Sequence, residues 1–154
     1  MAIAKKIFIG FGIFILVVAG GGLYGFLAKE EDAATPIFRK LKIGAAVFQM
    51  EIVGTSAEQT RGLSGREKLE ENQGMLFIFP NKAVRSFWMA GMKFPLDIIW
   101  ISGNKIIGIS ENLPPATAMN APIYSSPEPV DKVLEINAGL AEKLGIKVGD
   151  IISL

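Results

Sequence analysis

The sequence predicts a mostly β protein, namely a compact antiparallel β-sandwich or barrel-like domain with two short helices, preceded by one N-terminal transmembrane helix. Three observations lead to this prediction. Short apolar runs separated by glycine and proline turns fill the C-terminal two thirds of the chain. These runs do not alternate with long helical patterns, as they would in a parallel α/β protein. The chain begins with a long uncharged apolar stretch, and its 154 residues leave room for one globular domain.

The apolar stretch covers residues 7–28 and contains no charged side chain. As a helix it would span about 33 Å, against a hydrocarbon core of about 30 Å. Lysines precede it and acidic residues dominate the segment that follows, so the positive-inside rule keeps residues 1–6 in the cytoplasm and places the rest outside it. We therefore expect a single-pass anchor in the cell membrane. A cleaved signal peptide is the alternative.

Residues 29–45 are expected to form a tether and the entry to the domain, and residues 46–154 the extracytoplasmic β-rich domain. Residues 46–53 alternate between two faces, as strands do. Thr55 and Glu58 form a capping-box pattern for a short helix that Gly62 would end. The further strands are expected at residues 74–79, 84–90, 95–102, 105–110, 130–136 and 151–154.

Glycine and proline residues predict the form of two connections between strands in this domain. The strands at 95–102 and 105–110 are joined by a glycine-containing turn and should form a hairpin. The segment 113–129 holds five prolines and should be a long irregular loop. Asn137 is expected to cap a second short helix over 140–144.

The composition excludes several kinds of chemistry. The chain has no histidine and no cysteine, so disulfides, thiolate zinc sites, cysteine nucleophiles and histidine bases are impossible. Its net charge of +1 does not indicate a nucleic-acid surface. We expect no cofactor, no metal and no nucleic-acid partner.

Three stretches combine glycine, aromatic residues and single charges within apolar runs: Gly62-Leu63-Ser64-Gly65-Arg66 with Gly74-Met75-Leu76-Phe77, Arg85-Ser86-Phe87-Trp88-Met89 with Phe94-Pro95-Leu96-Asp97, and Val133-Leu134-Glu135-Ile136-Asn137-Ala138-Gly139. Together they resemble the family known as domain of unknown function 192, over about residues 47–152. The resemblance implies a compact β-sandwich-like fold, often behind a signal or anchor, without a settled activity. Ser64, Gly65 and Ala90 depart from the family's usual Met, Phe and Lys.

The charged residues of these motifs allow two interpretations. Asp97 lies between apolar strand neighbours and needs a partner, for which Arg66 or Arg85 is available. Such a pair would be structural. Alternatively, Asp97 and Glu135 could lie side by side as the two carboxylates of a hydrolase, with Arg66 nearby.

The aromatic and sulfur-containing residues of these motifs allow two further functional interpretations. Trp88 and its neighbours could form a platform for a sugar, a peptide or a partner protein. Met89 and Met92 could bind Cu(I) through their sulfurs, although methionines are also common core residues. The function we expect is non-catalytic binding of a small ligand or an envelope partner, with a hydrolase-type enzyme or a methionine copper site as alternatives. The candidate ligand-binding residues are Arg66, Arg85, Trp88, Met89, Asp97 and Glu135.

Overall fold

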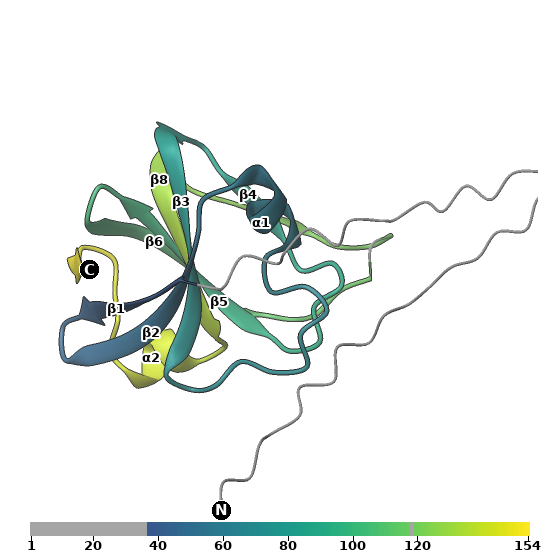
Figure 1. The fold of residues 1–154 in the computed structure, drawn as a ribbon, viewed down its shortest axis with the longest axis horizontal. Helices are drawn as coiled ribbons and strands as arrows, with labels where there is room; N and C mark the ends of the chain where they lie inside the picture. Colours follow the sequence, from purple (N-terminus) through teal and green to yellow (C-terminus); the bar gives the residue numbers. More distant parts are fainter. Residues whose placement is uncertain (1–36, 118) are drawn as a thin grey trace, which may run out of the picture. The chain divides into compact units, whose positions relative to one another are not determined.

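The computed structural model describes residues 37–117 and 119–154, which belong to one compact unit, Thr35–Leu154. Seven strands form a sheet with the order β6-β5-β8-β3-β2-β1-β9, and two short strands form a second sheet (Figure 1). The strands of the large sheet are β1 (Ile37–Ile43), β2 (Ala46–Val53), β3 (Gln73–Ala83), β5 (Leu96–Ser102), β6 (Lys105–Leu113), β8 (Val130–Asn137) and β9 (Ile152–Ser153). The small sheet pairs β4 (Ser86–Trp88) with β7 (Ile123–Ser125).

The large sheet is strongly curled, so that its first and last strands approach each other. Lys105 at the start of β6 forms an isolated antiparallel bridge with Ile151, next to β9. The backbone N–H of Ile106 donates to the Asp150 carbonyl at 2.9 Å, and that of Ile152 donates to the Asn104 carbonyl at 2.8 Å. The mostly β fold and the two short helices are therefore confirmed, as a curled half-barrel.

The strand pairing is antiparallel except between β2 and β3, which are parallel. The short helix α1 (Ser56–Arg61) lies in the connection between these two strands. The sequence did not predict this pair, because one crossover with a six-residue helix leaves no repeating strand–helix pattern.

The curled sheet is buried on both faces, and the alternation of side chains divides the core into two clusters. Phe48, Met50, Leu76, Leu134 and Ile136 belong to the first cluster, together with residues of α2 (Leu140–Lys143). The second cluster covers the opposite face and is formed mainly by Met75, Phe77, Met89, Ile98, Trp100 and Val133. Because residues 96–101 of β5 are all buried, this strand lies at the centre of the domain.

Several expected elements differ from the structure. The predicted tether and domain entry include β1, which pairs along its whole length with β2. The predicted irregular loop at 113–129 contains β7. The second helix begins at Leu140, as expected, but its N-cap is Gly139 and not Asn137, whose amide instead donates to the Leu69 and Glu70 carbonyls.

None of the helices within residues 37–117 and 119–154 is long and apolar enough to cross a bilayer. The predicted anchor at residues 7–28 lies outside the described residues.

Candidate functional site

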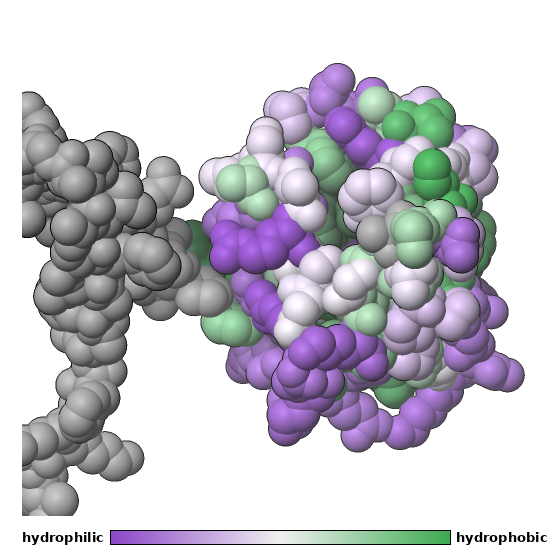
Figure 2. Space-filling view, turned by 90° about the vertical axis from the view of Figure 1, so that its right-hand side faces the viewer, coloured by the Kyte–Doolittle hydropathy of each residue, from purple (hydrophilic) through white to green (hydrophobic). Residues whose placement is uncertain are grey.

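A pocket of about 630 Å³ opens on the face of the sheet that carries the second core cluster. Its walls come from α1 and the turn after it, the end of β3, the small β4–β7 sheet and β8. Figure 2, which views the domain from the right-hand side of Figure 1, shows apolar surface gathered in patches among polar side chains. The apolar lining residues are Leu63, Phe77, Phe79, Val84, Phe87, Trp88, Met92 and Ile123.

Helix α1 is held beside the pocket by local capping and by one contact with the sheet. The Thr55 hydroxyl accepts from the Glu58 N–H at 3.3 Å, and the Glu58 carboxylate accepts from the Thr55 N–H at 3.0 Å, which completes the predicted capping box. The Gln59 amide donates to the Ile78 carbonyl of β3 at 2.9 Å. Gly62 ends the helix with φ +50°, a conformation that glycine adopts without strain.

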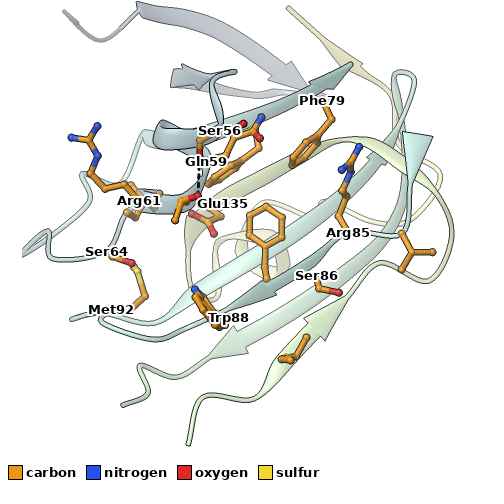
Figure 3. A pocket seen from close by; sticks show the side chains of 17 residues that line it. Ser56, Gln59, Arg61, Ser64, Phe79, Arg85, Ser86, Trp88, Met92 and Glu135 are labelled. Atoms are coloured by element: carbon orange, nitrogen blue, oxygen red, sulfur yellow. Dashed lines mark hydrogen bonds between the residues drawn. The ribbon is translucent and has the colours of Figure 1, made fainter. Parts of the chain in front are cut away.

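Glu135 projects from β8 into this pocket, as Figure 3 shows. Its side chain is buried, with the residue 5% exposed, and its Oε2 atom has no hydrogen-bond partner among the described residues. Its strand neighbours in register are Met75 and Ile98, both apolar. Burial therefore raises the pKa of the Glu135 carboxyl from 4.5 to about 8, and the group is mostly protonated at neutral pH.

Arg85 lines another part of the pocket, at the start of the small sheet. Its Nη2 donates to the Asn81 carbonyl at 2.7 Å and to Asn81 Oδ1 at 3.0 Å, and its guanidinium lies 4.0 Å from the centre of the Phe79 ring. Its Nε is buried and has no hydrogen-bond partner in the part of the chain that the structure describes. The Arg85 and Ser126 backbones hold this segment in place, since the Ser126 N–H donates to the Arg85 carbonyl at 2.9 Å.

The small β4–β7 sheet supplies the aromatic wall. Phe87 packs edge-on against Phe77 and Trp100, with ring centres 4.8 and 5.7 Å apart. Trp88 is 60% exposed, and it pairs in register with Ile123, which also lines the pocket. The aromatic residues thus reach from the buried core to the pocket rim.

The structure brings three of the six candidate residues, Arg85, Trp88 and Glu135, to the same pocket. Arg66 lies outside the lining and forms a two-point ion pair with Glu51, at 2.8 Å between Nη1 and Oε2 and 2.9 Å between Nη2 and Oε1. Met89 is fully buried in the second core cluster, whereas Met92 lines the pocket. Copper binding at these methionines stays a prediction.

The hydrogen-bond partners of Asp97 are neither of the two that we predicted, an arginine or the Glu135 carboxyl. Asp97 Oδ1 accepts from the Asn112 and Gly139 N–H groups at 2.8 and 3.1 Å, and Oδ2 accepts from the Ala141 N–H at 3.0 Å. It therefore joins β6 and the start of α2 to β5, without an arginine. Because Ile98 lies opposite Glu135 in register, Asp97 and Glu135 project from opposite faces of the sheet. The expected carboxylate pair is not formed.

Sequence reasoning missed Gln59 and Phe79, which also line the pocket. Gln59 was visible only as part of a helix start, and Phe79 as the end of an apolar run. Only the crossover from β2 through α1 to β3 brings them to the side on which Glu135 projects.

The fold and the pocket together show which class of protein this is. It is a small curled β domain with an aromatic pocket around one buried carboxyl group. The chain belongs to the DUF192 family, described as "Uncharacterized ACR", whose profile matches residues 39–154. This confirms the resemblance found in the sequence motifs. No curated protein matches the chain.

The solved structures that are similar to this chain include proteins from two organisms. A protein of unknown function from Novosphingobium aromaticivorans is 33% identical, with a TM-score of 0.71, over 79% of this chain and 94% of that one. A protein from Sinorhizobium meliloti, described as a "putative transcription regulator", is 29% identical, with a TM-score of 0.72, over 77% of this chain and 95% of that one.

Proposed function

We propose that the domain binds a small organic ligand in the pocket lined by Arg85, Trp88 and Glu135. The observation that carries this proposal is the buried Glu135 carboxyl, whose Oε2 atom lies on an apolar face and has no hydrogen-bond partner within residues 37–117 and 119–154. An unpartnered buried polar group costs roughly 1 to 3 kcal/mol, which a ligand that bonds to it would recover. A purely structural residue at this position would be expected to be apolar.

The pocket rim supports a ligand with an apolar or aromatic body. Val84, Trp88 and Ile123 line the pocket and remain 58%, 60% and 68% exposed. Exposed apolar side chains gathered around a concavity are typical of binding sites. A ligand seated against them would remove this surface from water.

Binding is supported better than the hydrolase alternative. Acid–base hydrolysis by two carboxylates needs a second acid beside Glu135. Glu135 is the only acidic residue among the described residues that line the pocket, and Asp97 is occupied by three backbone donors.

The test is a thermal-shift screen of the full-length protein against small aromatic and aliphatic compounds, sugars, peptides and metal ions. A ligand of the folded state must raise the melting temperature by mass action. We expect Trp88→Ala to weaken binding of each active compound severalfold, because it removes a wall of the pocket. Phe38→Ala is the matched control, since Phe38 is 51% exposed on β1 and lies outside the lining. Active compounds that bind both variants as tightly as the wild type would show that this pocket is not the site.

We also propose, from residues 7–28 alone, that the domain is anchored to the cell membrane and lies outside the cytoplasm. The support is the uncharged apolar stretch with its basic N-terminal flank. Alkaline extraction of isolated membranes should leave the intact chain in the membrane pellet. Recovery of the intact chain from the soluble fraction would contradict the anchor.

A further inference from the structure

Resting on the pocket function proposed above, we propose that the ligand is an apolar or aromatic anion, which Arg85 binds through its guanidinium while Glu135 donates a hydrogen bond to another acceptor of the same molecule. This names the chemical class of the ligand.

The lining contains two cations, Arg61 and Arg85, and one acid, Glu135. Figure 3 shows the Arg61 guanidinium turned away from the other labelled side chains, so Arg85 is the cation that the pocket presents. None of the ion pairs among the described residues involves Arg85 or Glu135. The pocket therefore keeps an uncompensated positive charge as long as Glu135 is neutral.

The unsatisfied atoms of the pocket also favour an acceptor-bearing ligand. Two buried side-chain polar atoms lack hydrogen-bond partners among the described residues, Arg85 Nε and Glu135 Oε2, and both residues line this pocket. An arginine nitrogen can only donate. A carboxyl surrounded by apolar neighbours is favoured in its neutral form, which also has a proton to donate.

A cationic ligand would fit these residues less well. To form an ion pair with Glu135, it would require this carboxyl to ionise between Met75 and Ile98, and it would place a second positive charge in the pocket that Arg85 lines. It would also leave the Arg85 Nε donor unsatisfied. An anion avoids all three costs, and hydrogen bonds from a charged donor are about twice as strong as neutral ones.

The two anchors are separated around the pocket, which sets the form of the ligand. Glu135 enters from β8 and Arg85 from the segment before β4, and Figure 3 shows them at different sides of the labelled cluster. The ligand would therefore carry its anion at one end and a neutral acceptor at another, with its apolar body along the aromatic wall.

The experiment compares three probes with one ring system and different charges: 2-naphthoate, 2-naphthamide and 2-naphthylmethylammonium. Binding is measured on the full-length protein through the NMR signal of the 13C-labelled methyl group of Met92, which lines the pocket. Met50 is the internal control, because it is buried in the first core cluster on the other face of the sheet. We expect naphthoate to bind about tenfold more tightly than naphthamide, and the ammonium probe to bind most weakly.

The variants assign this selectivity to Arg85. Arg85→Gln should make the affinities for naphthoate and naphthamide equal, and Arg85→Lys should restore part of the difference because it restores the charge. Arg39→Gln is the matched control, an exposed arginine of β1 outside the lining. Glu135→Gln should keep the preference for the anion, because a glutamine amide is a neutral donor as well.

The outcomes separate the two proposals. Tightest binding of the ammonium probe, or equal affinities of the three probes in the wild type, would overturn the anion proposal and leave the pocket function intact. Selectivity for naphthoate that survives Arg85→Gln would also overturn it. If none of the probes moves the Met92 signal at millimolar concentration, the proposed pocket function itself fails.

Discussion

The stability of the domain should fall as the pH rises through the neutral range, and Glu135 should be the cause. Burial raises the pKa of this carboxyl from 4.5 to about 8, so between these pH values the folded state holds a proton that the unfolded state has released. The free energy of unfolding therefore decreases with pH over this window. The contribution of Glu135 is most favourable below pH 4.5 and is lost as the pH rises through 8, the reverse of a salt-bridged carboxylate.

The size of this change in the unfolding free energy follows from the difference between the two pKa values of Glu135, 4.5 and about 8. Each pKa unit corresponds to 1.36 kcal/mol, so the contribution of Glu135 to the unfolding free energy should fall by about 3 kcal/mol between pH 4.5 and 7 and by about 4 kcal/mol between pH 4.5 and 9. Glu135→Gln removes the titration and keeps nearly the same shape. The difference in unfolding free energy between the two proteins should change by these amounts across the range, whatever the offset between them at low pH.

The assay is urea unfolding of both proteins at pH 4.5, 7 and 9. The other carboxyl groups titrate alike in both, so the difference isolates Glu135. Glu111→Gln, at an exposed glutamate of β6, is the control for the loss of one carboxyl group from the surface. Parallel profiles for the wild type and Glu135→Gln would refute the reasoning, since they would show that Glu135 has the same pKa folded and unfolded.

Three further outcomes are expected. Asp97→Asn should lower the unfolding free energy, measured in urea, by about 2 to 4 kcal/mol. The reason is that the amide group replaces one acceptor with a donor that faces backbone N–H groups. An unchanged urea midpoint would contradict the role of this carboxylate. Gly74→Ala should cost roughly 1 to 3 kcal/mol, since its Cβ would lie 2.6 Å from the Glu135 carbonyl oxygen and 2.8 Å from the Met50 methyl. Gly54→Ala, where a Cβ meets nothing within 4 Å, should stay within about 0.5 kcal/mol of the wild type, and an equal effect at both glycines would disprove the packing argument.

Local patterns were sufficient for the elements whose signals lie within a few residues. The alternation at 46–53 predicts β2 with its observed bounds, and the Thr55–Glu58 capping box predicts α1. The hairpin of β5 and β6 follows from its glycine turn. These elements depend on backbone conformations that neighbouring side chains select.

Elements that depend on distant partners were not visible in this way. Strand β1 has a burial pattern with only two buried residues, so its sequence looks like a polar tether until β2 pairs with it. Strand β7 is three residues long and lies between prolines, and it exists because β4 is beside it.

In the candidate site, too, some features could be predicted from the sequence and others depend on distant partners. Residue chemistry alone selected Arg85, Trp88 and Glu135 as unusual, and these three share the pocket. It selected Arg66 and Asp97 for the same reasons, yet Glu51 and three backbone N–H groups occupy them. A charged residue in an apolar run signals that a partner is needed, but not which partner the fold supplies.

The residue pattern was enough to establish that the domain is β-rich, that it belongs to one family, and that it cannot use histidine or cysteine chemistry. Which face of the sheet each acidic side chain occupies depends on how the strands pair. Asp97 and Glu135 both lie in buried strands, and the register between β5 and β8 sends one to a set of backbone donors and the other to an open aromatic pocket. Register arises from long-range pairing and the packing of two cores, so no local pattern could separate the structural carboxylate from the unpartnered one.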